Sequence, residues 1–340
     1  AHVNGGNGLF ILENAFRGTS SLTNVLSGKT VQNGVYQGQT LSGGGFLSPD
    51  LNYEGDKIVF CWMSGSNSYT WNQSTTYHIF KCDLDGSNLR ELTSGSKNDI
   101  HPAWLPDGNI IFISERRGGD GRCHQRPCPT FTLHTMDANG DNIRCISYHE
   151  TNEWWPAVDH NGMIVYTRWD YVDRGATHTH SAWITKPDGH NARQLVLNYT
   201  NSGSPEYGLG NVPMMQMQVR PIPGSNKYMA TAAPHHWECF GEVIVIDAEI
   251  EDDDWNSTIT RFTTNNGYPE SNGGGHRYGT PYPLSEEYAL VAYSPTQNGR
   301  WDLYAIDNAT NTTLLYNDSS LSCQSPIPVK SRTKPITCHV

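Results

Sequence analysis

Two stretches of this sequence recur at a nearly constant spacing, and this repeat constrains the fold more than any other feature. The first contains a Pro-initiated apolar segment and a turn, and its clearest copies place turn glycines at Gly55, Gly108 and Gly162, 53 and 54 residues apart. The second contains an Asx-Gly turn followed by apolar residues, and its copies span Asp83–Thr93, Asp137–Ser147 and Lys186–Val196. A period of about 50 residues with four short strands per unit is the signature of β-propeller blades.

Degenerate copies continue the pattern. A fourth begins at Arg220, a fifth at Thr280, and a sixth begins at Ser325 without being finished. Two N-terminal stretches, Gly8–Glu13 and Leu22–Leu26, resemble the outer strands that the sixth copy lacks. We therefore predict an all-β, six-bladed β-propeller whose ring is closed by N-terminal strands pairing with the C-terminal strand, because closure removes exposed sheet edges.

The segment 27–47 decides between six blades and the alternative of seven blades. Seven blades require that segment to pair as strands, whereas its Gly, Ser and Gln content is typical of a linker. We predict a single domain over 1–340, with closing outer strands in 1–26, repeats in 48–328 and a tail in 329–340.

Charge and hydropathy exclude several partners. The 340 residues include 23 Lys and Arg against 34 Asp and Glu, which gives a formal net charge of −11. Nucleic acids and anionic membranes bind clustered basic residues, so neither is expected as the main partner. No apolar run approaches the roughly 18 residues of a membrane span, so we expect no span.

Asn-x-Ser/Thr sequons point to an extracellular compartment. The chain begins at Ala1 without Met, which favours a processed mature chain or an excised fragment. Sequons in a chain of low charge favour a secreted or cell-surface glycoprotein with N-linked glycans. The acceptor residues are Asn72, Asn198, Asn256, Asn308, Asn311 and Asn317.

The eight cysteines agree with that compartment. Their number is even and no Cys-x-x-Cys is present, so disulfides are expected rather than zinc fingers. The candidates for bonding are Cys61 with Cys82, Cys123 with Cys128, and Cys323 with Cys338, with the connectivity left open. Cys145 and Cys239 have no candidate partner.

Chemistry in a propeller is expected at one end of its channel, where the loops entering first strands and leaving second strands converge. Those loops contain His101, Arg116, Trp154, Trp155 and His180. The sharpest hypothesis is a divalent metal, zinc or calcium, held by Asp170, His235 or His236, and His276, since imidazole and carboxylate ligands suit such ions. The alternative is that these residues hydrogen-bond long loops and line a wet channel.

An enzyme of hydrolase or lyase type would use a base or acid such as His235, His276 or Tyr278, with Arg168 neutralising a substrate carboxylate. No nucleophile and no spaced carboxylate pair is evident. Asp137–Asp141 resembles a calcium loop only superficially and is better explained as a turn between strands. Glu249–Asp254 is most simply a solvated loop.

Several longer phrases resemble a bacterial propeller family. They are Cys123–Cys128, Tyr148–Trp154, Ile164–Arg174, Ala232–His236, Tyr278–Leu284 and Ser322–Pro328. That family is similar to the middle domain of the hydrazine synthase alpha subunit and, more distantly, to TolB-type propellers with PD40-like repeats. The resemblance implies six blades. In the family enzyme the domain works with covalent haem and zinc, but this chain has no Cys-x-x-Cys-His for haem attachment, so that chemistry is not expected here.

Two classes of function remain. The favoured one is a noncatalytic structural or interaction protein, a protomer of an extracellular homo-oligomer or filament, with the tail 329–340 docking on a neighbouring copy. The alternative is a metal-dependent enzyme, redox or polysaccharide lyase in type, with a site at the channel mouth. No catalytic residue is assigned.

Overall fold

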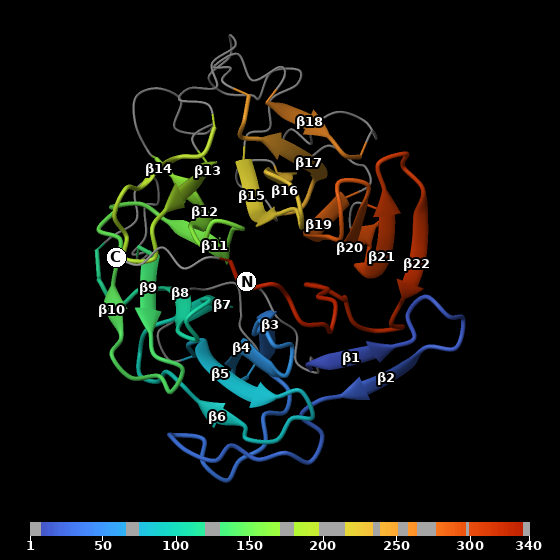
Figure 1. Cartoon of the computed structure of the whole chain (residues 1–340). Coiled ribbons are helices and arrows are strands. Elements are labelled where there is room, and N and C mark those ends of the chain that lie inside the picture. Colours follow the sequence, from blue (N-terminus) through green and yellow to red (C-terminus); the bar gives the residue numbers. More distant parts are fainter. Residues whose placement is uncertain are drawn as a thin grey trace. The chain divides into compact units, whose positions relative to one another are not determined.

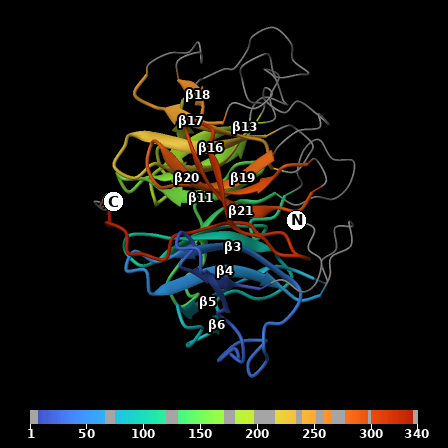
Figure 2. The same cartoon turned by 90° about the vertical axis from the view of Figure 1, so that its right-hand side faces the viewer.

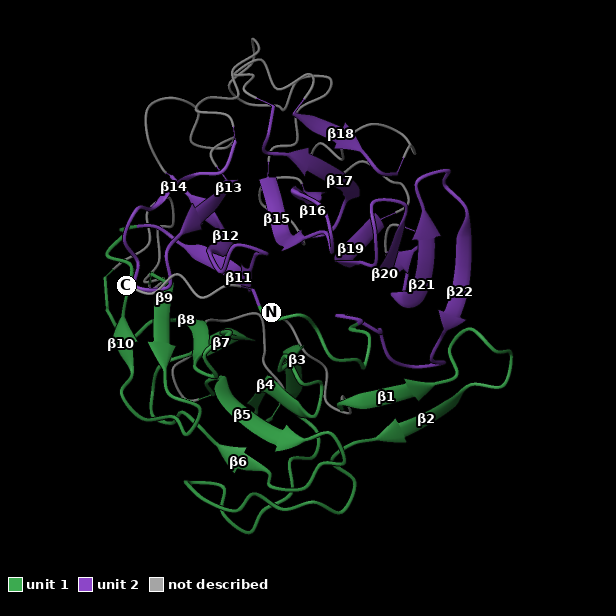
Figure 3. Cartoon of the chain, viewed as in Figure 1, with its two compact units in different colours: residues 1–150, 327–334 green, residues 151–326, 335–340 purple. Residues whose placement is uncertain are grey.

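A computed structural model describes residues 8–65, 75–119, 130–170, 180–196, 215–233, 239–250, 258–263, 277–296 and 299–335. These residues form an all-β structure (Figure 1), as predicted. None of them belongs to a helix that is long and apolar enough to cross a membrane. The chain divides into two compact units (Figure 3), residues 1–150 with 327–334 and residues 151–326 with 335–340.

Unit 1 contains two four-stranded antiparallel sheets and a hairpin in the part of the chain that the structure describes. The first sheet is β3 (Gly45–Leu51), β4 (Lys57–Met63), β5 (His78–Asp83) and β6 (Arg90–Glu91), in that order (Figure 2). The second is β7 (Asp99–Trp104), β8 (Ile110–Ser114), β9 (Thr132–Met136) and β10 (Arg144–Cys145). The hairpin is β1 (Phe10–Glu13) with β2 (Ser21–Asn24).

The described residues of unit 2 form three groups of four consecutive strands. They are β11 (Glu153–Val158), β12 (Ile164–Trp169), β13 (His180–Thr185) and β14 (Arg193–Gln194); β15 (Met215–Pro221), β16 (Lys227–Ala233), β17 (Glu242–Asp247) and β18 (Ile259–Arg261); and β19 (Arg277–Pro283), β20 (Tyr288–Ser294), β21 (Asp302–Asp307) and β22 (Thr312–Tyr316). One parallel bridge between His180 and Met215 connects the first two groups.

The middle strands are apolar on both faces because successive sheets within a unit pack face to face. Every residue of β8 is buried. Val59 and Ile79 of the first sheet share a core with Trp104 and Phe112 of the second. Each such side chain contributes roughly 2 kcal/mol of burial, so near-continuous apolar strands are what this stacking requires.

The repeated turns form as the sequence predicts. Gly86 and Asn88 both have positive φ, at 78° and 54°, and the same pair of conformations recurs at Gly140 and Asn142. The Asp137 amide donates to the Asp141 carbonyl at 2.9 Å, so this segment is a turn between strands, as expected. Residues with small or Asx side chains occupy left-handed φ at the lowest cost.

The first strand of each four-strand group contains a β-bulge that the sequence pattern did not reveal. The left-handed residue lies at Ser48, His101, Trp155, Gln218 or Thr280, with φ between 46° and 58°. The register of each first strand shifts at that point. In four of the five strands a proline follows directly. A proline cannot donate to the ladder, and a bulge lets it lie within the sheet.

The predicted closure is not present in the described residues. There β1 and β2 pair only with each other, and residues 322–335 form no strand. Pro326 and Pro328 alternate along this C-terminal segment and remove two amide donors from the same edge, which disfavours pairing. Residues 27–44 form turns without a strand, so the condition for seven blades is not met, and β3 starts at Gly45, inside the predicted linker. The six-blade count and the single domain stay predictions.

The structure contradicts the candidate bond between Cys61 and Cys82. Both are buried thiols, and the β4–β5 register places Cys61 opposite Ile79 and Cys82 opposite Ile58. They are three ladder positions apart, and side chains alternate faces along a strand, so the two sulfurs lie on opposite faces. Burial raises the pKa of the Cys61 thiol and raises that of Cys82 to about 12. Cys323 is also a free thiol, while Cys123, Cys128 and Cys338 lie outside the described residues.

Candidate functional site

Each four-stranded sheet has two distinct ends. Because the strands alternate in direction, the first and third strands begin, and the second and fourth end, at one edge, which we call the loop end. For β7–β10 this edge includes residues 92–98 and the described residues 115–119 and 130–131 of the connection between β8 and β9. The opposite edge, the turn end, includes the short turns after Trp104 and Met136. Candidate chemistry therefore has to be sought at the loop ends.

Asp99 is the centre of a buried polar network at the loop end of unit 1. Its side chain is fully buried and accepts hydrogen bonds from Ser114 Oγ at 2.6 Å, Arg116 Nη2 at 2.6 Å and Arg116 Nε at 3.0 Å. The same guanidinium donates to the Ser94 carbonyl at 3.1 Å. The charges are thus paired in bidentate geometry, which is the arrangement of a structural ion pair.

A second pair extends this network. Glu115 is buried and accepts from Asn98 Nδ2 at 2.9 Å, while Asn98 Oδ1 accepts from the Tyr77 amide at 2.9 Å. Burial raises the pKa of the Glu115 carboxyl. These bonds tie the start of β5 to the end of β8 and fix the loop end of two neighbouring sheets.

Three histidines lie buried near this network and are neutral near pH 7. Burial lowers the pKa of His101 to about 3 and lowers the pKa values of His78 and His134. His78 Nε2 lies 3.0 Å from the Thr76 hydroxyl, and His134 Nδ1 lies 2.9 Å from the Thr132 carbonyl. The candidate loop residue His101 is thus a buried bulge residue.

In unit 2 the predicted ligand Asp170 forms an ion pair. Its Oδ1 accepts from Arg168 Nε at 3.0 Å, and the Arg168 guanidinium lies 4.0 Å from the centre of the Trp183 ring. His180 stacks between Trp154 and Trp169, with ring centres 6.0 and 4.8 Å away. Arg168 is therefore already engaged by a carboxylate of the same unit.

Glu242 has the most unusual acidity of the carboxyl groups in the described ranges. It is the first residue of β17, it is 3% exposed, and burial raises its pKa to about 7. Thr263 Oγ1 donates to its carboxylate and accepts from the Val243 amide at 3.0 Å. A carboxyl half ionised near pH 7 can accept or donate a proton, although burial restricts access to substrate.

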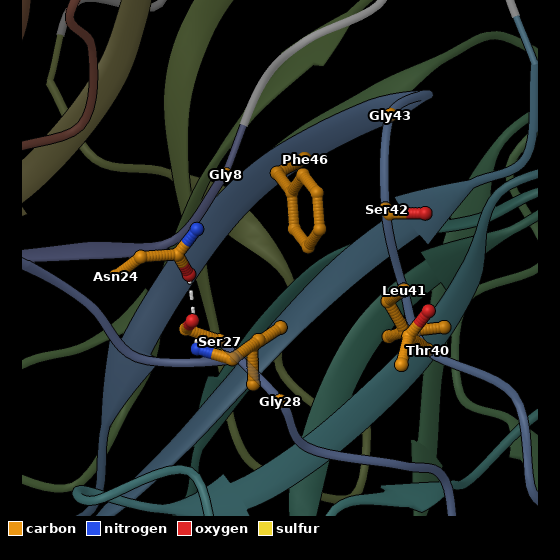
Figure 4. A pocket seen from close by; sticks show the side chains of 10 residues that line it. Gly8, Asn24, Ser27, Gly28, Thr40, Leu41, Ser42, Gly43 and Phe46 are labelled. Carbon is orange, nitrogen blue, oxygen red and sulfur yellow. Dashed lines mark hydrogen bonds between the residues drawn. The ribbon is translucent and has the colours of Figure 1, made fainter.

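A pocket of about 340 Å³ lies in unit 1 beside the hairpin (Figure 4). Figure 4 shows the Phe46 ring among Asn24, Ser27, Thr40 and Leu41. Its lining contains hydroxyl, amide and apolar groups and no ionisable side chain. Such a lining suits an extended peptide or a sugar better than acid–base chemistry.

The metal hypothesis stays a prediction. Among the residues that the structure describes, no group of three or more His, Cys, Asp or Glu side chains converges on one point. His235, His236 and His276 lie outside those residues. Tyr278, offered as an acid or base, is buried and stacks on Tyr293 at 4.5 Å.

The sequons fall into two sets. Asn308, Asn311 and Asn317 are exposed and flank β22, while Asn72, Asn198 and Asn256 lie outside the described ranges. Glycosylation at all six stays a prediction.

Comparison with known proteins identifies the fold. No family model matches the chain. A TolB homologue of Chlorobium chlorochromatii is 36% identical over 132 residues, which are 38% of this chain and 25% of the homologue. Hydrazine synthase of Kuenenia stuttgartiensis superposes with a TM-score of 0.69 at 17% identity, covering 93% of this chain and 42% of that one. TolB of Acinetobacter baumannii superposes with a TM-score of 0.54 at 12% identity, covering 93% and 64%.

This chain has a TolB-like β-propeller fold. The resemblance to TolB and hydrazine synthase propellers is confirmed. The TolB-like propeller spans a quarter of the curated TolB homologue it matches and less than half of the hydrazine synthase chain. The likeness to solved structures therefore establishes the fold and not an activity.

Sequence reasoning missed the acidic residues that open two first strands of this TolB-like propeller. Asp99 and Glu153 are both fully buried, and each follows an asparagine and precedes a proline by three positions. That repeated Asn-acidic-x-x-Pro pattern was a usable signal. Glu242 follows Gly241 and does not match this pattern, and burial is the main cause of its raised pKa.

Proposed function

We propose that this TolB-like propeller is a noncatalytic structural and interaction protein located outside the cytoplasm, and that it carries N-linked glycans and assembles with its own copies. One observation carries the proposal: in the described part of the chain, the sheet β1–β2 has two strands where the other sheets of unit 1 have four. One edge of β1 is left without a partner strand among those residues.

An open strand edge is a site for pairing with another chain. Isolated two-stranded hairpins are marginally stable, and exposed backbone donors and acceptors recruit further strands. The hairpin also exposes apolar side chains, with Phe10 42% and Leu22 40% exposed. Strand addition at such an edge is an established mode of protein recognition.

The sequons support assembly through the hairpin rather than through the other outer strands. Asn311 precedes β22 by one residue and Asn317 follows it by one, and β22 is the last strand of its sheet (Figure 1). Glycans at these positions would block strand addition at β22, where Leu314 is 48% exposed. The edge of β1 has no sequon within the hairpin.

The test is sedimentation of the chain expressed in a glycosylating eukaryotic host. We expect particles at multiples of the 37.9 kDa chain mass plus glycan, and a mass loss on enzymatic removal of N-glycans. The matched variant Thr310→Ala/Thr313→Ala/Ser319→Ala removes three sequons while keeping each asparagine. A glycan-free monomer at every concentration would contradict the proposal.

The alternative is a metal-dependent enzyme with its active site at the channel mouth. Its reaction would be of the redox or the polysaccharide lyase type. The pKa of Glu242 near 7 is the observation in its favour. A stoichiometric zinc or other divalent ion in the isolated protein, together with an activity that Glu242→Gln abolishes, would establish this alternative over the first.

A further inference from the structure

The C-terminal residues repeat the sequence of β3 and β4. Ser325 and Pro326 match Ser48 and Pro49, and at the same offset Lys334 matches Lys57 and Cys338 matches Cys61. The backbone agrees, because Ser325 has φ 53° and Ser48 has φ 49°. Residues 325–328 therefore correspond to a first strand, and residues 334–340 carry the pattern of a second strand, with Ile336-Thr-Cys-His-Val340 in place of Val59-Phe-Cys-Trp-Met63.

The segment between these two parts does not form the usual turn. Gly55, with φ 77°, occupies the β3–β4 turn, but the matching residue is Arg332. The Arg332 amide donates to the Tyr53 carbonyl at 2.8 Å, and its guanidinium lies 3.5 Å from the Asp50 carboxylate. Lys334 Nζ lies 2.7 Å from the Glu54 carboxylate. These contacts hold the segment at the β3–β4 turn.

A place for a second strand exists in the same unit. The third strand of the first sheet, β5, pairs with β4 on one edge and with β6 on the other. In the described residues β1 pairs only with β2, so the edge that corresponds to the β4 side of β5 has no partner strand there. Ile79 and Leu9 occupy matching positions if Glu13 is aligned with Asp83. The packing supports that alignment: Leu9 and Ile11 both contact the core of the β3–β6 sheet, as one face of a third strand should contact the next sheet.

We propose that residues 335–340 of one copy pair with β1 of a second copy, as β4 pairs with β5. The β4–β5 register transfers directly and places Ile336 opposite Ile11 and Cys338 opposite Leu9. Ile336 then adds to the apolar face formed by Leu9 and Ile11. The donated strand runs antiparallel to β1, and the same register places His339 opposite Gly8, which lines the pocket that contains Phe46.

This inference deepens and rests on the proposed self-assembly. The donor segment and the acceptor edge are different surfaces, so the contact is head-to-tail and each copy keeps one free donor and one free acceptor. A contact of this kind builds filaments when its rotation does not close. The tail docking expected from the sequence thereby acquires a specific acceptor, the edge of β1.

The test is a disulfide trap in the full chain. Directly opposed residues of antiparallel strands bring Cβ atoms within the range of a disulfide, so Leu9→Cys should bond to the native Cys338 of a neighbour. Phe10→Cys is the matched control, because its side chain lies on the opposite face of β1. We expect about tenfold more cross-linked oligomer from Leu9→Cys on non-reducing gels, and none from Leu9→Cys/Cys338→Ser.

Mixing isotopically heavy and light copies distinguishes the outcomes. Cross-linked peptides that join a heavy and a light chain confirm the exchange between copies. A link within one chain, or no link at either position while the wild type assembles, overturns the inference and leaves the proposed function standing. A wild type that sediments as a monomer at every concentration would contradict the self-assembly on which this inference rests. Truncation before Pro335 provides a second measurement and is expected to yield monomers.

Discussion

The two ends of the β7–β10 sheet are built on opposite principles. At the turn end, Asp107 is exposed and accepts from the Asn109 amide at 2.9 Å, beside Gly108 with φ 92°. At the loop end, Asp99 is fully buried and pairs with Arg116, seventeen residues away in sequence. The aspartate at the turn end bonds a neighbouring residue and is exposed to solvent. The aspartate at the loop end bonds a residue distant in sequence and is buried. The loop end should therefore be far more sensitive to substitution.

Removal of the buried carboxylate should have the largest effect. Asp99→Ala leaves the Arg116 guanidinium and the Ser114 hydroxyl without their acceptor, and breaking a buried pair costs about 4 kcal/mol. Urea unfolding measures the change in the free energy of unfolding. The control is Asp107→Ala at the turn end, where we expect a loss of about 1 kcal/mol or less. Equal losses would show that the two ends do not differ.

The second-largest effect is a pH dependence of stability that we expect from Glu242, at the loop end of a sheet in unit 2. The pKa of Glu242 is raised from 4.5 to about 7 in the folded chain, so the folded state holds a proton that the unfolded state releases in this window. Stability from this group is complete below pH 4.5 and is lost as pH rises to 7, in total about 3 kcal/mol. Glu242→Gln should remove this dependence.

The measurement compares the unfolding free energies of wild type and Glu242→Gln at pH 4.5 and pH 8. The variant should gain on the wild type only at the higher pH. A difference that is the same at both pH values would mean that the carboxyl is not buried in its neutral form.

The smallest effect belongs to the turn end. Gly108→Ala meets no heavy atom within 4 Å of the added carbon, so only the left-handed backbone is penalised, at about 1 kcal/mol. Asn88→Gly, at another left-handed turn position, should change stability by about half of that or less. A loss from Gly108→Ala as large as that from Asp99→Ala would remove the contrast between the ends.

The sequence predicts features that depend on local contacts better than features that depend on long-range contacts. The turns around Gly86 and Gly140 were predictable because four adjacent residues determine them. The first strands were found by their prolines, but the bulge at Ser48 or His101 was not, since it depends on register with a second strand. Cys61 and Cys82 were placed in the correct neighbouring strands, and only the register showed that they lie on opposite faces.

The candidate site was less predictable for a physical reason. Arg168 and Asp170 were both named, yet their pairing depends on the path of β12, and Glu242 becomes a weak acid only through burial. Predictions based on residue type named polar residues one at a time. They could not assign which charges neutralise one another.

The sequence by itself determined the all-β repeat, the turn chemistry and the resemblance to TolB-like propellers, because these depend on short-range conformational preferences repeated along the chain. Only the tertiary structure decided the bulged first strands, the Asp99–Arg116 pairing, the acidity of Glu242 and the pairing of β1 with β2 alone among the described residues. Each of these depends on how far water is excluded and on which distant strand comes alongside. Packing between sheets determines both the exclusion of water and the choice of the adjacent strand, and local conformational preference determines neither.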